Sequence, residues 1–252
     1  MSLKDKTIVV TGGSRGLGLG LVEALVDHGA RVSVVARDKA ALAAVQKRLG
    51  VAVISADITD EGTALRILGD VRPEVLVLNA GTPPRMGRLD QVSWADFTAP
   101  WETDVKGGFY WIQGALNVPL APGARVLVSS SGAAQQGSPL SGGYAGAKRM
   151  LWFMAKYANG VAEQKGLGIR FQAIMPRQMI GGTGVGDAGA SAYARAMGIE
   201  REAFLARFGA PMPPRQFGDH VVAVLDDPQY ARGLVFGLKG DTAITVIEEA
   251  TA

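Results

Sequence analysis

A tyrosine and a lysine four residues apart, Tyr144 and Lys148, form the pair whose types and spacing best suit proton transfer. On a helix, positions i and i+4 share a face, so the phenol and the ammonium group would point into the same space. The ammonium group would favour the phenolate and pull the tyrosine pKa down from about 10 toward neutral pH. Ser131, thirteen residues before the tyrosine and at the end of an apolar run, could hold a substrate oxygen. These residues predict a proton-transfer site for a carbonyl or an alcohol.

A glycine-rich turn near the N-terminus would supply such a site with a hydride carrier. The apolar run Thr7–Val10 leads into the turn Thr11–Gly18 and then into a helical pattern. Glycines allow a tight turn and close backbone approach, and a helix N-terminus presents free N–H groups to a phosphate. The spacing is G-x-x-x-G-x-G, which differs from the usual G-x-G-x-x-G dinucleotide pattern. The unit indicates a Rossmann-type phosphate site, with a plain glycine connection as the alternative.

Length and composition indicate one domain with a large core. The chain has 252 residues, of which 48% are hydrophobic and 19% are charged. It contains no cysteine, which excludes disulfides and thiolate metal sites, and we expect no metal. The net charge is +3, but no dense basic run with interleaved aromatic residues indicates nucleic-acid binding. The first strand begins within seven residues and no apolar run approaches the ~20 residues of a membrane span, so we expect no signal peptide, no membrane partner and a cytoplasmic location.

Apolar strand-like runs alternate with helical stretches along the whole chain. Runs rich in Val, Ile and Leu are typical of strands covered on both faces, as in a parallel sheet. This order predicts an α/β, doubly wound sheet with right-handed crossovers in a single domain over residues 1–252. The expected strands are Thr7–Val10, Arg31–Val35, Ala52–Ser55, Val75–Leu78, Arg125–Ser129, Ile169–Ile174 and Leu234–Gly237.

One segment, residues 181–217, breaks this alternation. It contains several glycines and prolines and a helical patch at Ser191–Phe208, and it follows the sixth expected strand. In open α/β sheets, ligands bind beyond the carboxyl ends of the strands. The segment is therefore a candidate lid over the substrate, with an ordinary surface helical hairpin as the alternative.

Taken together, the motifs resemble the short-chain dehydrogenase/reductase family in its single-domain form, over roughly residues 5–240. The resemblance is carried by the turn Thr11–Gly18, Asp57, Asn79-Ala80-Gly81, Ser131, Tyr144 with Lys148, and Pro176. It implies a Rossmann-like seven-stranded parallel sheet of order 3-2-1-4-5-6-7, a nicotinamide cofactor, and hydride transfer to or from a carbonyl carbon.

The resemblance also implies a role for each matching residue. Tyr144 matches the general acid/base, and Lys148 the residue that lowers its pKa and bonds the nicotinamide ribose. Ser131 matches the residue that holds the substrate oxygen, with Ser130 as the alternative, and Asp57 meets the adenine amino group. The residues expected to bind the cofactor are Gly12, Ser14, Arg15, Gly16, Leu17, Gly18, Arg37, Asp57, Ile58, Asn79, Ala80, Gly81, Tyr144, Lys148, Pro176, Arg177 and Met179.

The chain departs from the family pattern at two places. The first is Asp104, where the family often has an asparagine whose main-chain carbonyl holds a water in a proton relay. A backbone role can survive the change, but a buried carboxylate near Lys148 would raise the tyrosine pKa relative to relatives, so Asp104 is a further catalytic candidate. The second lies after Pro176, where Arg177 replaces a glycine and position 181 is glycine, with Thr183 the nearest threonine. The loop that binds the carboxamide must differ, and Arg177 either reaches an anion or points to solvent.

The end of the second strand favours NADP(H) over NAD(H). Where NAD-binding relatives carry an acid, this chain has Ala36, followed by Arg37, and Arg15 lies in the glycine turn. Two guanidinium groups could grip a 2′-phosphate, since planar forks suit phosphate. Asp38 is the alternative ribose acceptor if the strand ends one residue later, and Arg37 could also be a solvated surface arginine.

The substrate is a carbonyl or alcohol compound, and an apolar or aromatic ketone is favoured over a sugar. Reduction is the expected direction, by analogy with the family. The residues expected to line its site are Pro83, Pro84, Met86, Gln135, Gln136, Met179, Ile180, Tyr193, Met197, Phe204 and Phe208, although Phe204 and Phe208 fit core packing equally well.

Two other functions and an assembly are considered. A 3-oxoacyl-carrier-protein reductase could meet an acidic carrier through Arg195, Arg201 and Arg207. A non-catalytic NADP-binding sensor or scaffold is the alternative of another class. A homodimer or homotetramer is expected from the family, and the apolar face of the stretch Tyr144–Tyr157, with Met150, Leu151, Phe153 and Met154, suits either a helix interface or packing on the sheet.

Overall fold

The computed structural model describes residues 2–118, 120–240 and 244–249, and one sheet organises the whole chain. Its strand order is β3-β2-β1-β4-β5-β6-β7-β8, so the predicted order of the first seven strands is confirmed. These seven are parallel, as expected, and an eighth strand that was not expected pairs antiparallel with β7. The strands are β1 Thr7–Thr11, β2 Arg31–Ala36, β3 Ala52–Ser55, β4 Val75–Leu78, β5 Arg125–Ser129, β6 Arg170–Pro176, β7 Gly233–Leu238 and β8 Thr245–Glu249.

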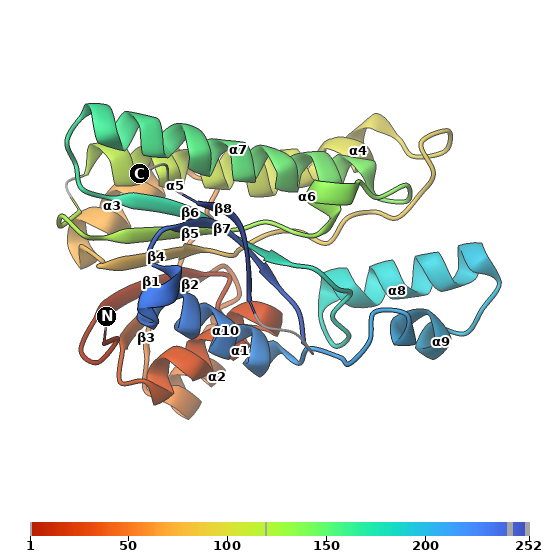
Figure 1. The fold of residues 1–252 in the computed structure, drawn as a ribbon, viewed down its shortest axis with the longest axis horizontal. Coiled ribbons are helices and arrows are strands. Elements are labelled where there is room, and N and C mark those ends of the chain that lie inside the picture. The colour runs from red at the N-terminus through yellow and green to blue at the C-terminus, as the bar shows by residue number, and fades with distance from the viewer. Residues whose placement is uncertain (1, 119, 241–243, 250–252) are drawn as a thin grey trace.

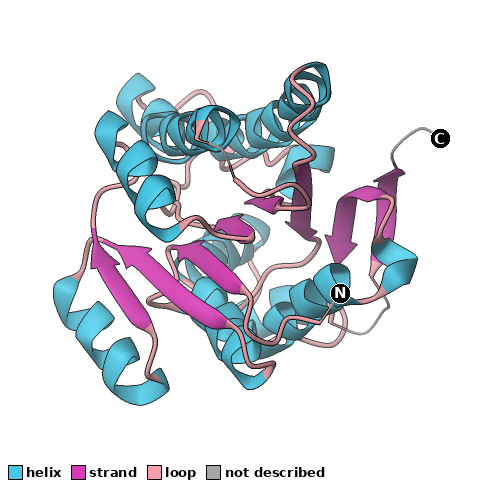
Figure 2. Cartoon of the chain, turned by 90° about the vertical axis from the view of Figure 1, so that its left-hand side faces the viewer, coloured by secondary structure: helices cyan, strands magenta, loops and turns pink. Residues whose placement is uncertain are grey.

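Helices cover both faces of the sheet (Figure 1, Figure 2). On one face lie α1 Gly16–Asp27, α2 Lys39–Leu49 and α10 Pro214–Asp226. On the other lie α3 Glu61–Val71, α5 Lys106–Asn117 and α7 Gly142–Gln164. The shorter elements are α4 Trp94–Pro100, the π-helix η1 Trp101–Val105, α6 Ala133–Gln136, α8 Gly184–Met197, α9 Arg201–Ala206 and the 3₁₀-helix η2 Pro228–Tyr230.

The central strands have apolar side chains toward both layers, which explains why they form a parallel sheet. All four residues of β4 are buried, and Ile8, Val9 and Val10 of β1 have no exposed surface. Two hydrophobic clusters result, one on each face of the sheet. Because all seven parallel strands end at one edge, the loops that follow them meet there. Among the described residues, no helix combines the length and the apolar character that crossing a membrane requires.

Helices α8 and α9 follow β6 and extend away from the two helical layers (Figure 1). Helix α8 begins at Gly184, earlier than the expected patch, because the Thr183 side chain caps it by accepting a hydrogen bond from the Gly186 amide. The expected lid boundary at residue 217 is too late, since Phe217 belongs to α10 and lies fully buried in the main core. The pair α8–α9, which we call the lid after the role expected for it, carries a small hydrophobic cluster of its own.

Candidate active site

A cavity of about 850 Å³ lies at the carboxyl ends of the strands. Every residue expected to bind the cofactor lines it, and so do the four catalytic candidates Ser131, Tyr144, Lys148 and Asp104. Its volume suits a cofactor with a substrate. Of the residues expected around the substrate, Gln135 does not line the cavity, whereas the neighbouring Gln136 does. The cavity therefore brings together residues that are far apart in the chain.

The glycine turn forms the floor at one end of the cavity. Gly12 has a φ of +69°, and a Cβ there would lie 2.7 Å from the Cα of Ala80. A Cβ at Gly18 would lie 2.2 Å from the carbonyl oxygen of Gly12, so neither glycine can be replaced without movement of the turn. The N-cap residue of α1, Arg15, makes no side-chain cap, which leaves the first N–H groups of the helix available to an anion. These features fit the pyrophosphate of a dinucleotide.

The loop Asn79-Ala80-Gly81 is tied to this turn by a residue that the sequence argument did not select. The hydroxyl oxygen of Thr11, at the end of β1, accepts hydrogen bonds from the amides of Asn79 (3.0 Å) and Ala80 (3.2 Å). The Asn79 side chain donates in return to the carbonyl oxygens of Thr11 and Gly12 at 3.4 Å. The signal available in the sequence was the position of this threonine, at the end of an apolar run and directly before the first glycine.

At the other side of the turn, Arg37 and Asp57 approach each other. Arg37 Nη1 lies 3.6 Å from Asp57 Oδ2, and both side chains are exposed. The Thr59 amide donates to Asp57, and this bond together with Arg37 lowers the pKa of the Asp57 carboxyl against the opposing effect of partial burial. Asp38 is engaged elsewhere, since its Oδ1 accepts from the amides of residues 40 and 41 and caps α2.

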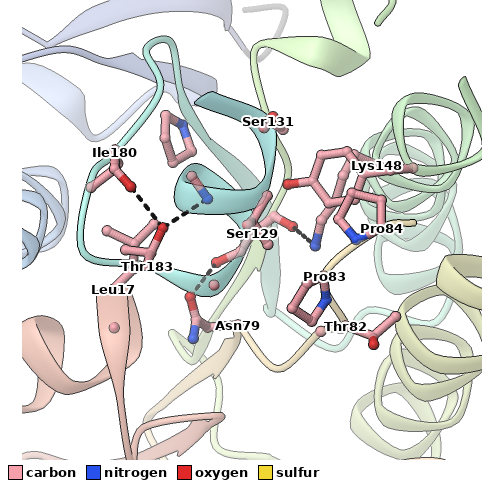
Figure 3. A pocket seen from close by; sticks show the side chains of 18 of the residues that line it. Leu17, Asn79, Thr82, Pro83, Pro84, Ser129, Ser131, Lys148, Ile180 and Thr183 are labelled. Atoms are coloured by element: carbon pink, nitrogen blue, oxygen red, sulfur yellow. Dashed lines mark hydrogen bonds between the residues drawn. The ribbon is translucent and has the colours of Figure 1, made fainter. Parts of the chain in front are cut away.

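Tyr144 and Lys148 are buried on α7, on the wall of the cavity. Lys148 Nζ lies 5.6 Å from the centre of the Tyr144 ring and 3.3 Å from the carbonyl oxygen of Ser129. In the view of Figure 3, Ser131 and Lys148 lie toward one side of the pocket, with Leu17, Asn79 and Thr183 toward the other. The Ser130 hydroxyl donates to the main-chain oxygen of Lys148 (2.9 Å), which leaves Ser131 as the serine near Tyr144, where it acts to lower the tyrosine pKa.

The carboxylate of Asp104 is paired directly with the lysine. Asp104 Oδ2 lies 2.9 Å from Lys148 Nζ, and the two side chains are 0% and 7% exposed. The Thr82 amide donates to Oδ1 at 2.8 Å, a contact that sequence reasoning missed. A Cβ at Gly81 would lie 2.6 Å from Oδ2, so the glycine makes room for the carboxylate. Asp104 belongs to the π-helix η1, which follows Pro100, a residue that disrupts regular helical hydrogen bonding.

These contacts set the charge balance of the site. Burial raises the pKa of Tyr144, Asp104 adds to that rise, and together they outweigh the lowering by Lys148 and Ser131. The expected lowering of the tyrosine pKa is therefore wrong, because that expectation considered only Lys148 and not the burial of the phenol. Burial lowers the pKa of Lys148, but Asp104 and Tyr144 raise it more, so the pKa of Lys148 lies above its ordinary value.

Comparisons with known proteins show the family of this chain. The sequence model of the family described as short chain dehydrogenase matches residues 6–186. The chain belongs to the short-chain dehydrogenase/reductase family. It is 34% identical to the short chain dehydrogenase/reductase AacuD of Aspergillus aculeatus over 57% of this chain and 54% of that protein. It is 31% identical to the L-fucose dehydrogenase of Rattus norvegicus over 68% of this chain and 65% of that protein. The matches thus span about half to two thirds of these relatives.

Solved structures of the family share the fold along nearly the full chain. Actinorhodin polyketide ketoreductase with NADPH has a TM-score of 0.80 and 21% identity, covering 94% of this chain and 96% of that chain. The 3-ketoacyl-(acyl-carrier-protein) reductase from Brucella melitensis with NADH has a TM-score of 0.78 and 20% identity, covering 95% and 99%. Members of the short-chain dehydrogenase/reductase family are oxidoreductases that use nicotinamide cofactors.

The loop after β6, where the chain departs from the family pattern, lines the cavity and reaches the glycine turn. A Cβ at Gly16 of the glycine turn would lie 3.8 Å from the Thr183 side chain, so Thr183 lies beside the turn despite its shifted position. The Cδ of Arg177 would lie 2.5 Å from a Cβ at Gly237, so its stem crosses β7.

A tyrosine of the lid, Tyr193, hydrogen bonds to the loop that contains Ser138 and Leu140. The Tyr193 hydroxyl lies 2.7 Å from Ser138 Oγ and accepts from the Leu140 amide at 3.3 Å. Its ring stacks on Phe204, with centroids 5.6 Å apart, and Phe204 packs edge-on against Phe208. Phe204 and Phe208 therefore serve both the cluster of the lid and the wall of the cavity.

Proposed function

We propose that this protein is an NADP(H)-dependent oxidoreductase that reduces a ketone or aldehyde to an alcohol, or catalyses the reverse. The observation that carries the proposal is one cavity with a glycine turn and free helix N-terminus at one end and Ser131, Tyr144 and Lys148 in its wall. The family membership supports the same reaction class. A non-catalytic NADP-binding sensor has no need for an acid, its cationic partner and a hydroxyl placed together.

The chemistry follows from the positions of four side chains. The glycine turn and the N-terminus of α1 would hold a nicotinamide nucleotide, which would supply or accept the hydride. Ser131 and Tyr144 hold the carbonyl oxygen, and Tyr144 donates its proton to it, a general-acid step worth about 10² to 10⁴-fold. The raised pKa of Tyr144 keeps the phenol protonated at neutral pH, as an acid requires. Lys148 stabilises the tyrosinate that remains, and Asp104 holds Lys148 in place.

The choice of NADP(H) is supported by the end of β2. The strand ends at Ala36, no acidic side chain stands at that position, and Asp38 is occupied in capping α2. Arg37 and Arg15 both line the cavity. The two similar solved structures do not favour either nucleotide, since one was determined with NADPH and the other with NADH.

Replacing Arg37 by aspartate is expected to weaken NADPH binding far more than NADH binding. The substitution removes a cation from the 2′-phosphate region and adds a charge that repels it. Dissociation constants of both nucleotides, measured by titration calorimetry, check this. Arg48→Gln is the control, because Arg48 lies in the following helix α2, pairs with Glu23 and does not line the cavity. Equal losses for the two nucleotides would remove the phosphate argument.

The walls of the substrate end support an apolar or aromatic substrate. Met86, Tyr193, Met197, Phe204 and Phe208 all line this part of the cavity. The rival function, 3-oxoacyl-carrier-protein reduction, draws on surface arginines, and one of the three proposed for it, Arg201, is already paired with Asp187 in the lid. This rival function is supported by the similarity of the chain to the 3-oxoacyl-[acyl-carrier-protein] reductase of rhamnolipid biosynthesis from Pseudomonas aeruginosa.

The proposed function is tested by NADPH oxidation, followed by absorbance, against a panel of aryl ketones, aliphatic ketones and 3-oxoacyl thioesters. Turnover of aryl ketones above the thioesters supports the main proposal, and the reverse order supports the carrier-protein function. Tight NADPH binding without turnover of any panel member would favour the sensor.

The expected homo-oligomer remains a proposal that the surface of α7 supports. Phe153 stacks on Tyr157, and the Tyr157 side chain stands in solvent, with the residue 59% exposed. Leu151 and Met154, in contrast, are buried against the sheet and belong to the core. Met150 also packs against that core cluster, so of the four residues expected on this face only Phe153, beside the exposed Tyr157, is left to meet a second copy. The cytoplasmic location also stays a prediction.

A further inference from the structure

The two ends of the cavity differ in charge. Three carboxylates line the cavity, and each already interacts with a group of the protein outside the substrate end. Asp38 caps α2, Asp57 lies beside Arg37, and Asp104 is buried against Lys148. The lid and the loop leading to it contribute two cationic side chains to the lining, Arg177 and Arg207, and no carboxylate. The substrate end is therefore positive.

Most polar side chains that this segment presents to the cavity are already engaged. Thr183 donates to the Ile180 carbonyl oxygen and caps α8. Gln178 bonds the carbonyl oxygen of Ala210 and the amide of Gly240, and Tyr193 bonds the Ser138 loop. These groups fix the lid and have little capacity left for a ligand.

Arg207 differs from the other cations of the lid. It follows α9, lines the cavity, and donates from Nη1 to the Met197 sulfur at 3.1 Å, a weak acceptor. Within the described parts of the chain neither Arg207 nor Arg177 forms an ion pair, whereas Arg201 of α9 is held by Asp187. The Arg177 stem crosses β7, and Arg207 lies at the end of the cavity lined by Met197, Phe204 and Phe208. Arg195 is exposed, as Arg207 is, but it does not line the cavity.

We propose that Arg207 binds an anionic group of the substrate, a carboxylate or phosphate at the end of an apolar body remote from the reacting carbonyl. The inference rests on the proposed function and adds a substrate class to it. Met197, Phe204 and Phe208 line the same end of the cavity, so a bound body would displace water around the guanidinium. An ion pair in such surroundings is stronger than one in bulk water, and the guanidinium fork suits both anions.

Matched substrate pairs test this. The first pair is 4-acetylbenzoate and its methyl ester, and the second is a 3-oxoacyl pantetheine with and without its terminal phosphate. With NADPH, Arg207→Gln is expected to raise KM for the charged member by about fivefold to tenfold, with kcat and the neutral member within about twofold. Added salt should weaken the preference of the wild type and leave the variant unaffected. The pair that responds identifies the anion as a free carboxylate or a carrier phosphate.

Arg195→Gln is the control, since it removes an exposed lid cation outside the cavity. Equal effects of Arg207→Gln on both members of each pair, or no effect, would overturn the proposal, as would a response of Arg177→Gln in its place. If the wild type reduces none of the four compounds, the proposed function fails separately. Calorimetric titration of 4-ethylbenzoate into the wild type and Arg207→Gln then decides the assignment, and equal affinities would reject it.

Discussion

Replacing Tyr144 by phenylalanine is expected to lower kcat by about 10² to 10⁴-fold and to leave NADPH binding nearly unchanged. The substitution removes one hydroxyl, which is the proton donor of the proposed reaction. The ring stays in its place on α7, beside Lys148 Nζ, so the wall of the cavity keeps its shape. Steady-state rates and calorimetric NADPH titration measure the two effects separately.

Tyr157→Phe is the matched control for this variant. It removes the same atom from the same helix at a residue that is 59% exposed, and it should leave both rate and binding unchanged. Substantial turnover by Tyr144→Phe would show that another group donates the proton. Loss of nucleotide binding would instead indicate that the hydroxyl holds the cofactor.

Asp104→Asn is expected to destabilise the fold, because it leaves the buried ammonium group of Lys148 without its negative partner. Removing one partner of a buried ion pair typically costs about 3–5 kcal/mol. The pKa of Lys148 is raised in the folded state, so the stability contributed by the pair is fully present at neutral pH and is lost only as the pH rises through that folded pKa. Urea denaturation at pH 7 measures the loss.

A double variant separates charge from shape at this position. Asp104→Asn combined with Lys148→Met removes both charges, and it should recover most of the stability lost by Asp104→Asn alone. If the double variant is as unstable as the single one, the carboxylate stabilises the site through the Thr82 amide and the surrounding packing.

The same substitution is expected to shift the pH profile of the reaction. Asp104 raises the pKa of Tyr144, so its removal lowers that pKa. Alcohol oxidation needs the tyrosinate, and its rate therefore rises with pH through the tyrosine pKa. The rising limb for Asp104→Asn should lie at lower pH than that of the wild type. An unchanged limb would mean that the charge of Asp104 does not reach the phenol.

Periodicity and composition predicted the sheet well, because a parallel sheet covered on both faces needs uninterrupted apolar strands. The bounds of β3, β4 and β5 are those expected, and β1, β2, β6 and β7 end one or two residues later. Strand β8 was missed. It lies at the edge, and its pairing with β7 is irregular, so tertiary contact rather than local pattern defines it.

The candidate site was predictable where spacing along one element decides it, as for Tyr144 and Lys148 on α7. Contacts between distant elements were not predictable. The Thr82 amide meets Asp104 through a π-helix, and Tyr193 meets Ser138 through the fold of the lid. The direction of the Tyr144 pKa shift also depends on burial, which the helical spacing does not contain.

The lid packs around Ala190, Ala194 and Phe204, in a cluster separate from the two that flank the sheet. Substitutions there can therefore reshape the proposed substrate wall while the glycine turn and the proposed proton-transfer residues keep their support. Such modularity favours evolvability. Directed libraries that diversify Met197, Phe204 and Phe208 should broaden the accepted substrates with little loss of folded protein, whereas libraries at the glycine turn should mostly yield inactive chains.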